Sequence, residues 1–152
     1  MKKLVYIDMD NVLVDFQSGI DRLDSEIIRQ YKDDLDEVPG IFGLMDPYPG
    51  AIESIHQLAE RYDLYILSTA PWLNPTAWID KVKWVHKYFG KDESSLFYKR
   101  LIISHHKNLN KGDFLIDDRP NNGAKDFLGE WLHFKSEKFP DWLAVTNYLM
   151  DS

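Results

Sequence analysis

The residues of this chain that could do chemistry follow short apolar segments, at the points where buried strands would end. They are Asp8, Asp10, Thr69, Lys107, Asp117 and Asp118. Ligands of an open parallel sheet bind beyond the carboxyl ends of its strands, so we expect these side chains to meet in one crevice. Crowded carboxylates repel one another unless a cation neutralises them, and hard oxygen ligands favour Mg²⁺, which also binds phosphate oxygens. With a lysine and a hydroxyl as phosphate donors, the set predicts phosphoryl transfer.

The spacing of Asp8 and Asp10 has a mechanical meaning. In an extended segment, residues i and i+2 project to the same side, about 7 Å apart. One carboxylate could then attack phosphorus while the other serves the leaving oxygen. A single Asp-x-Asp pair is weak evidence, because aspartate also caps helices and begins turns. Four groups in order, each after an expected strand, favour catalysis over capping.

The apolar segments themselves predict an α/β fold. Short continuous apolar runs, typical of strands buried on both faces, cover residues 4–7, 64–67, 101–103, 114–116 and 131–134. Helical patterns lie between and after them, at 51–61, 75–89 and about 141–149. This alternation predicts a Rossmann-like, mainly parallel sheet flanked by helices.

The helix expected at 75–89 has the clearest end signals. Asn74 stands at the N-cap position, Pro75 at the first helical position and Gly90 just past the last turn. Its inward stripe is expected to comprise Trp78, Val82, Val85 and Phe89. The inward residues of the other two helices are expected to be Ile52, Ile55 and Ala59, and Trp142, Val145 and Leu149.

The segment from about 17 to 45 does not fit a simple βαβ unit, which needs only one helix between its strands. A helical stripe of apolar residues runs through it: Ile20, Leu23, Ile27, Tyr31 and Leu35. We therefore expect a single domain over 1–152, with a core made of 1–16 and 46–152. A small helical cap is inserted after the first strand.

The composition excludes several classes of protein. The 152 residues carry a formal net charge of -7, whereas a domain that binds nucleic acid polymers usually has a basic surface. No apolar run approaches the roughly 18 residues that span a bilayer, and there is no cysteine for a disulfide or a thiolate metal site. We expect a cytoplasmic protein that acts on a small phosphorylated metabolite, with no nucleic acid or membrane partner.

Longer strings narrow the function. Residues 8–13, 68–69, 107 and 117–118 occur in the order of the four motifs of haloacid-dehalogenase superfamily phosphatases. The strings at 8–16, 47–51, 84–90 and 115–120 resemble the 5'(3')-deoxyribonucleotidase family, and the resemblance covers nearly the whole chain. It implies a Mg²⁺-dependent phosphomonoesterase for nucleoside 5'- or 3'-monophosphates. Within that class, our own expectation is a pyrimidine deoxyribonucleotide.

The resemblance also implies the catalytic roles. Asp8 would be the nucleophile that forms an aspartyl-phosphate, and Asp10 the general acid and later the base. Mg²⁺ would be held by Asp8, the Asp10 carbonyl and the pair Asp117 and Asp118, with Asp118 as the direct ligand.

Phosphate and substrate contacts follow in the same way. Thr69, the backbone around Ala70 and Lys107 would hold the phosphate oxygens. Phe16 would face the nucleobase, with Phe42 and Trp72 as further substrate contacts. Phe16 and Phe42 could instead be core aromatics that hold the cap down, and Lys107 has a competitor in Lys111 nearby.

The sequence departs from the family pattern in three places. Asn11 stands where glycine is commoner, Ala70 where animal members have serine, and the aromatic cap segment is reduced to residues 41–45. The catalytic roles survive, because asparagine tolerates left-handed backbone and a backbone N–H needs no particular side chain. Base and sugar preference does not follow from the resemblance.

Three alternatives stay open at this point. One is a general phosphatase for sugar phosphates or other metabolites, and another is a nucleotide-binding module without catalysis. The third is a phospho-receiver domain, although in receivers the paired acids follow the first strand and the phosphoacceptor the third, the reverse of the order here. A homodimer also stays open.

Overall fold

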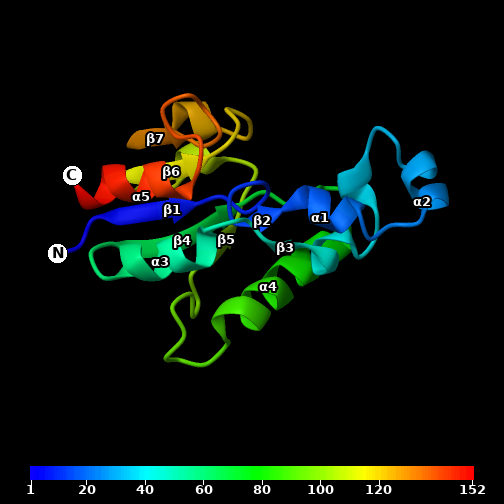
Figure 1. Cartoon of the computed structure of the whole chain (residues 1–152), viewed down its shortest axis with the longest axis horizontal. Helices are drawn as coiled ribbons and strands as arrows, with labels where there is room; N and C mark the ends of the chain where they lie inside the picture. Colours follow the sequence, from blue (N-terminus) through cyan, green and yellow to red (C-terminus); the bar gives the residue numbers. More distant parts are fainter.

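A computed structural model describes residues 1–152, and its centre is a five-stranded parallel sheet (Figure 1). In the order β5-β4-β1-β6-β7, the strands are Leu101–Ile103, Asp63–Ser68, Leu4–Ile7, Phe114–Asp117 and Glu130–His133. All five expected strands are confirmed, each within one residue of its expected ends. The central strand β1 pairs with β4 on one side and with β6 on the other. The loops that follow β1, β4 and β6 therefore leave the same edge of the sheet.

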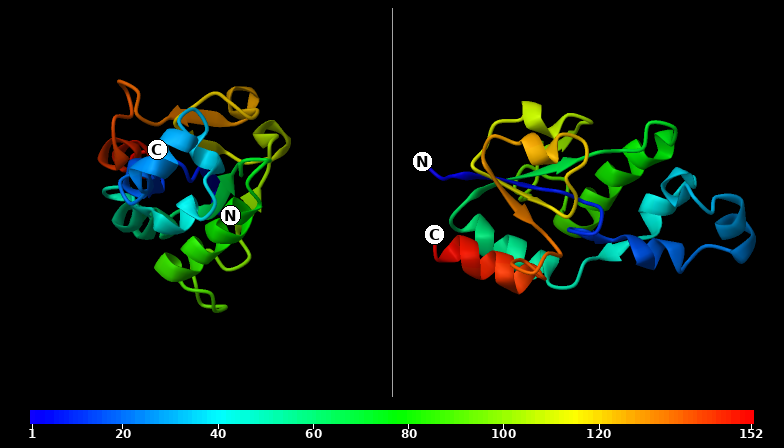
Figure 2. Two further views of the ribbon diagram at one scale, coloured as in Figure 1. Left: turned by 90° about the vertical axis from the view of Figure 1, so that its right-hand side faces the viewer. Right: turned by 90° about the horizontal axis from the view of Figure 1, so that it is seen from above.

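The two faces of the sheet are covered differently. The helices α3 (Ala51–Ala59), α4 (Pro75–Phe89) and α5 (Trp142–Met150) contribute to one cluster of 29 buried residues, together with alternate strand residues such as Val5 and Ile7. Figure 2 shows α3 and α5 side by side beneath the sheet. Tyr6 points to the other face, where a cluster of five buried residues is closed by the short 3-10 helix η4 (Ala124–Asp126). The period of two along β1 thus separates two cores of unequal size.

Helix α4 has the expected ends but a different buried face. It spans Pro75–Phe89, and Gly90 follows with a φ of 89°. Its buried residues are Ala77, Lys81, Trp84 and Val85. The prediction that Val82 faces inward is wrong, since 37% of Val82 is exposed. The stripe is rotated because α4 packs against the 3-10 helix η2 (Ile41–Leu44) as well as the sheet, and because a lysine is buried on the inner face.

Asn74 does more than begin α4. It stands at the N-cap position, but its side chain caps no helical N–H. Its amide nitrogen instead donates to the carbonyl oxygens of Asp36 (2.9 Å) and Val38 (3.1 Å). The start of α4 is therefore tied to the segment inserted after the first strand.

That inserted segment, residues 16–45, is folded as short helices, and we call it the cap segment. It contains α1 (Phe16–Ile20), α2 (Ser25–Gln30), η1 (Leu35–Glu37) and η2. The antiparallel strands β2 (Val14–Asp15) and β3 (Asp46–Pro47) join its two ends to the rest of the chain. Figures 1 and 2 place it at the end of the molecule opposite both termini.

The apolar stripe of the cap segment is confirmed, although it does not belong to one helix. All five residues from Ile20 to Leu35 that form the stripe are partly buried and pack against the larger core. The helix is interrupted between α1 and α2, where the chain reads Asp21-Arg22-Leu23-Asp24 and Asp24 is extended. Aspartate favours helix starts over helix interiors, so a new helix begins here. None of the helices in the structure is long and apolar enough to cross a membrane.

Candidate active site

The loop after β1 presents two carboxylates at the edge of the sheet. The backbone N–H of Asp8 still donates to Ile116 on β6 (2.9 Å), so Asp8 leaves the sheet at its last ladder bond. The chain then folds back through a tight turn in which Asn11 has a φ of 62°. Asparagine is one of the few residues that adopts this left-handed conformation at little cost. Asn11 therefore serves where glycine is commoner, as expected.

Three of the predicted acids converge. Carboxylate oxygens of Asp8, Asp117 and Asp118 all lie within 4.8 Å of one another. Asp8 and Asp117 are buried, at 7% and 3% exposed. Burial and the nearby Asp8 raise the pKa of Asp118 to about 6 and that of Asp117 to about 7. The cluster is therefore costly as three free charges and needs a cation.

Lys107 supplies one positive charge to this cluster. Its ammonium nitrogen lies 2.8 Å from Asp8 Oδ1 and 2.6 Å from Asp117 Oδ2. Burial opposes the charged form, but Asp8 and Asp117 outweigh it and raise the pKa of Lys107 above its usual value. The backbone N–H of Lys107 donates to the carbonyl of Asn122 (2.7 Å), which holds the η3 turn (Lys107–Leu109) beside the loop after β6. Lys107, and not Lys111, is thus the lysine at the carboxylates.

The two acids after β6 differ in how their oxygens are used. Asp117 Oδ1 accepts from the backbone N–H of Arg119 (3.1 Å), and Oδ2 accepts from Lys107. Asp118 Oδ1 is buried and has no hydrogen-bond partner. Because a buried polar atom without a partner is rare, this oxygen points to a ligand outside the chain. Three carboxylates with one free oxygen fit a hard divalent cation such as Mg²⁺.

Asp10 lies apart from the three clustered acids and has its own partner. Its Oδ1 accepts from the ammonium of Lys81 at 2.9 Å. Burial raises the pKa of Asp10, Lys81 opposes that shift and the charge of Asp8 adds to it. A raised pKa suits a carboxyl group that must carry a proton at neutral pH.

The loop after β4 brings Thr69 to the same place. Thr69 lines a small cavity of about 10 Å³ together with Asp8, Asp10 and Lys107. Its hydroxyl donates to the carbonyl of Ser104 (2.7 Å), so it must rotate before it can donate to a phosphate. Ala70 is fully buried and is not among the residues that line this cavity, so its expected contact with phosphate stays a prediction.

A larger cavity of about 360 Å³ adjoins the first, and the two share Asp10 and Arg119. Its wall comes mainly from the cap segment: Phe16, Lys32, Asp33, Leu35 and Asp36. Sites for small molecules typically measure roughly 300 to 1,000 Å³. The larger cavity is therefore big enough for an organic group attached to whatever binds at the carboxylates.

The predicted aromatic contacts occupy three different environments. Phe16 lines the larger cavity, and its ring meets the ring of Phe42 edge-on, with centroids 5.8 Å apart. Phe42 is only 2% exposed, packs against Phe16 and is not among the residues that line the cavity. Trp72 is 76% exposed and contacts His105, with ring centroids 5.9 Å apart. Of the three, Phe16 is the one that faces the cavity.

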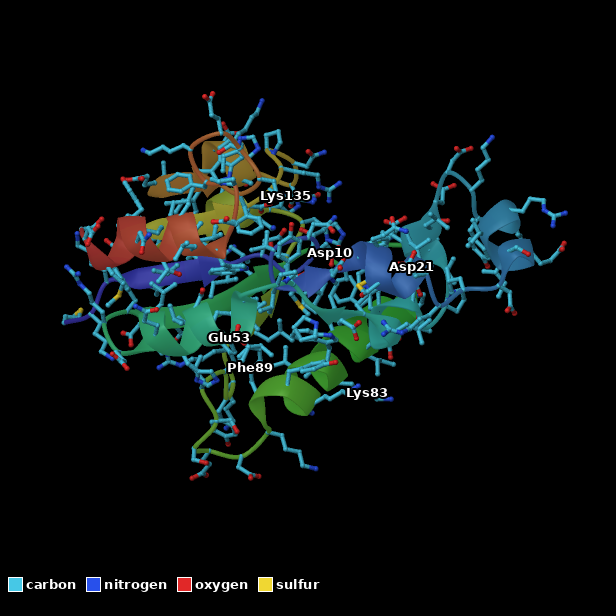
Figure 3. The ribbon with its side chains drawn as sticks, viewed as in Figure 1. Asp10, Asp21, Glu53, Lys83, Phe89 and Lys135 are labelled. Carbon is cyan, nitrogen blue, oxygen red and sulfur yellow. The ribbon has the colours of Figure 1, made fainter.

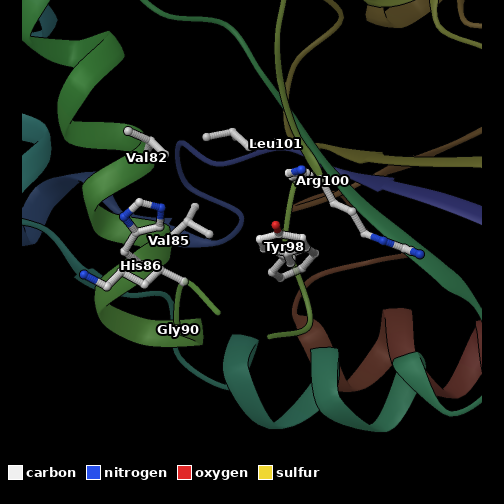
Figure 4. A pocket seen from close by; sticks show the side chains of 10 residues that line it. Val82, Val85, His86, Gly90, Tyr98, Arg100 and Leu101 are labelled. Atoms are coloured by element: carbon white, nitrogen blue, oxygen red, sulfur yellow. The ribbon is translucent and has the colours of Figure 1, made fainter. Parts of the chain in front are cut away.

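A separate cavity of about 320 Å³ lies between α4 and residues 97–101. Figure 4 shows Val82, Val85 and His86 of α4 across from Tyr98 and Leu101. It contains no carboxylate, and it lies outside the sites predicted from the sequence. Its volume is close to the 360 Å³ of the cavity at Asp10, so size alone does not distinguish the two.

Comparison with known proteins decides the family. Residues 25–138 match the family model described as "5' nucleotidase, deoxy (Pyrimidine), cytosolic type C protein". A protein of Vibrio phage KVP40, to which 5'(3')-deoxyribonucleotidase activity is ascribed, is 57% identical over 148 residues, which cover 97% of this chain and 85% of the phage protein. The chain belongs to the 5'(3')-deoxyribonucleotidase family. It is therefore a phosphatase, as the order of its motifs predicts.

More distant members and solved structures agree with this family. The cytosolic 5'(3')-deoxyribonucleotidase of Homo sapiens is 27% identical over 158 residues, covering 85% of this chain and 77% of the human protein. A HAD-superfamily hydrolase of Geobacter sulfurreducens superposes with a TM-score of 0.60 at 12% identity, covering 97% and 96% of the two chains. A Bacillus subtilis HAD hydrolase that was crystallised bound to magnesium has a TM-score of 0.58 at 13% identity, covering 97% and 98%. The structural likeness confirms the HAD-like α/β fold.

Sequence reasoning missed several residues at this deoxyribonucleotidase-family site. Lys81 is the most consequential, and Arg119, Asn121 and Asn122 line the small cavity. Nothing in the neighbouring sequence distinguishes the buried Lys81 from Lys83 and Lys87, which lie on the same helix and are exposed. Arg119 lies at both cavities, and its backbone N–H donates to Asp117 Oδ1.

Proposed function

We propose that this phosphatase hydrolyses deoxyribonucleoside 5'- or 3'-monophosphates, with Mg²⁺ as cofactor and an aspartyl-phosphate on Asp8 as intermediate. The observation that carries the proposal is one continuous arrangement. Asp8, Asp117 and Asp118 cluster beside Lys107, and a cavity of about 360 Å³ faced by Phe16 begins at Asp10. A site suited to phosphate chemistry therefore lies next to a cavity that could hold a nucleoside.

The first half of the reaction transfers the phosphoryl group to the enzyme. A carboxylate oxygen of Asp8 attacks phosphorus, and the bond from phosphorus to the ester oxygen breaks. The leaving oxygen takes the electron pair of that bond and a proton from Asp10. Lys107, which contacts Asp8, lowers the electrostatic cost of bringing an anionic phosphate to a carboxylate.

The second half restores the enzyme. Asp10, now a carboxylate, takes a proton from water, and the water oxygen attacks phosphorus. The bond between phosphorus and the Asp8 oxygen breaks, inorganic phosphate leaves, and Asp10 is protonated again. A general acid or base placed in this way typically contributes about 10²- to 10⁴-fold to the rate.

Mg²⁺ would be held by Asp8, Asp118 and the Asp10 carbonyl. Bound there, it would neutralise charge on the carboxylates and on the phosphate oxygens. The free Oδ1 of Asp118 supports Asp118 as the direct ligand. Both carboxylate oxygens of Asp117 already accept hydrogen bonds, one from Lys107 and one from Arg119, which suits a supporting role.

We expect the larger cavity to favour a nucleoside over a sugar alone. Phe16 offers an aromatic face on which a base can stack, which is worth about 1 to 3 kcal/mol per base in single-strand binding. A mononucleotide also presents a single phosphate to a protein whose net charge is -7, whereas a polynucleotide would bring many. The nucleotidases among the relatives support the same substrate class.

The test is a phosphate-release screen. It compares deoxyribonucleoside and ribonucleoside 5'- and 3'-monophosphates with sugar phosphates and an aryl phosphate, each with Mg²⁺ and with a chelator. We expect the highest kcat/KM with a deoxyribonucleotide and no turnover with chelator. A sugar phosphate as the best substrate would replace the nucleotidase with a general metabolite phosphatase. Nucleotide binding without phosphate release would leave only a binding module.

A further inference from the structure

Lys81 is a fully buried charge in the middle of α4, with 0% of its surface exposed. A lysine ammonium is normally kept in water, because burying an unpaired charge is costly. Lys83, two residues further along, follows that rule and is exposed (Figure 3). Helix formation by itself gives no reason for a charge at position 81, so the reason must lie in what the ammonium touches.

The ammonium of Lys81 has three partners. Its nitrogen lies 2.9 Å from Asp10 Oδ1 and 2.9 Å from Ser68 Oγ. It also lies 4.3 Å from the centre of the Phe42 ring. Two hydrogen bonds and an aromatic face satisfy a lysine ammonium, which has three donors and no acceptor. The side chain is therefore held in one place from three directions.

Asp10 is held only on one side. Lys81 engages Oδ1, and Oδ2 accepts none of the hydrogen bonds within the protein. Asp10 lines both the small cavity with the acids and the larger cavity with Phe16. The carboxyl group thus has one oxygen tied to the helix and one available where the leaving group of a substrate would lie.

We propose that Lys81 is a positioning residue that orients Asp10, holding Oδ1 so that Oδ2 exchanges the proton with the leaving oxygen. The inference rests on the proposed function, in which Asp10 is the general acid. Lys81 itself exchanges no proton with the substrate and contacts none of the reacting atoms.

The Phe42 contact ties this orientation to the cap segment. Phe42 lies on η2, its ring packs edge-on against Phe16, and Phe16 faces the cavity. The ammonium of Lys81 lies over the same ring of Phe42 that supports Phe16. The Phe42 ring therefore supports both Phe16 and the lysine that orients Asp10, so a substitution at Phe42 should affect both.

The test compares Lys81→Met with the matched control Lys83→Met from the same helix. Both variants are assayed with a deoxyribonucleotide, whose alkoxide leaving group needs a proton, and with an aryl phosphate, whose leaving group hardly does. For Lys81→Met we expect kcat on the nucleotide to fall about 10- to 100-fold, within the range of general acid catalysis. KM should change less than about twofold. The loss of rate on the aryl phosphate should be smaller than the loss on the nucleotide, because the aryl phosphate needs Asp10 only as the base of the second half-reaction. Lys83→Met should match the unaltered protein on both substrates.

A double-mutant cycle separates positioning from loss of stability. Lys81→Met alone leaves Asp10 as a buried charge without a partner, which could unfold the protein, whereas Asp10→Asn with Lys81→Met removes both charges. If Lys81 acts through Asp10, the double variant turns over the nucleotide as fast as Asp10→Asn alone. Circular dichroism of all variants accompanies the assay.

Each outcome has a distinct reading. Equal losses on both substrates, a changed KM with unchanged kcat, or a further loss on the Asp10→Asn background would overturn the positioning role while leaving the proposed function in place. So would a Lys81→Met variant that behaves like Lys83→Met. An unaltered protein that releases no phosphate from any compound would overturn the proposed function and, with it, the acid that Lys81 orients.

Discussion

The acidic cluster at the strand ends and helix α2 of the cap segment are held by different kinds of interaction. At the strand ends, Asp8, Lys107 and Asp117 are all buried and joined by ion pairs of 2.6 to 2.8 Å. In the cap segment, α2 has no buried residue, and its ion pair between Arg29 and Glu26 is 72% and 80% exposed. Buried networks hold one geometry, whereas exposed ion pairs contribute little.

This difference suggests a division of labour. Chemistry requires atoms placed to within a fraction of an ångström, which suits residues at the ends of strands in a packed sheet. Substrate selection tolerates more movement, which suits short helices joined to the core by the two-stranded β2 and β3. The following substitutions test whether the strand ends and the cap segment separate in this way.

The largest effect is expected at the nucleophile. Asp8→Asn keeps the shape of the side chain but removes the attacking charge, so kcat should fall by at least roughly 10³-fold on every substrate. Steady-state phosphate release checks this, with circular dichroism to show that the fold persists. Near-normal turnover would remove Asp8 from the role of nucleophile.

The next effect separates the two acids after β6. Asp118→Asn should raise the Mg²⁺ concentration for half-maximal rate by at least about 100-fold, and Asp117→Asn by about 10-fold, because supporting partners of metal ligands usually cost 10- to 100-fold. Magnesium titrations of the two variants at saturating substrate measure both values. The reverse ranking would make Asp117 the direct ligand, and unchanged titrations would remove both acids from the metal site.

In the cap segment, Phe16→Ala should act selectively. Loss of base stacking, about 1 to 3 kcal/mol, corresponds to roughly 5- to 150-fold in kcat/KM for a nucleotide. A small aryl phosphate should be much less affected, because Asp8 and Asp10 are untouched. Phe16→Leu, which keeps an apolar side chain against Phe42, should fall between. Equal losses on nucleotide and aryl phosphate would mean that the cap segment and the catalytic residues are not separable.

The smallest effect concerns stability and pH. The folded protein raises the pKa of Asp117 to about 7 and of Asp118 to about 6, above the ordinary value of about 3.9 for an aspartate. Folded protein therefore keeps protons that the unfolded chain has lost. The stability from these two groups is full below about pH 4 and is lost as pH rises through 6 and 7.

Mg²⁺ should reverse that loss, because it replaces the protons on the same carboxylates. We expect Mg²⁺ to raise the Tm by a few degrees more at pH 7.5 than at pH 5. Thermal melts with and without Mg²⁺ at the two pH values check this, and Asp118→Asn serves as the control in which the difference shrinks. An equal shift of Tm at both pH values would contradict a metal bound by these acids.

The predictions that succeeded rest on local rules. Asp8, Asp117 and Lys107 were placed together because each follows a short apolar run, and parallel strands end at one edge of a sheet. The limits of α4 followed from Pro75 and Gly90 for the same reason, since helix ends depend on the residues at the ends. The roles of the site residues, and the treatment of 17–45 as a cap distinct from the core, stay predictions.

The residues that the sequence did not predict owe their positions to partners that are distant in the chain. Lys81 lies 71 positions from Asp10, and nothing around it distinguishes it from the exposed Lys83. The burial of Lys81 also explains why the predicted inward stripe of α4 is wrong at Val82, because the inner face of the helix includes a charged residue, which is rarely buried. Asn74 likewise bonds to Asp36 and Val38 of the cap segment in place of its own helix.

The sequence by itself determined the α/β class, the five strands and the set of acids at their ends, because each depends on apolar runs and short-range spacing. Only the tertiary structure decided which oxygen of each acid is free, that Phe42 packs against Phe16, and that a lysine is buried against Asp10. The physical reason is that a buried charge is tolerable only when its partner is in place. The partner of Lys81 is brought into contact only by the folding of the whole chain, so no local pattern of residues predicts it.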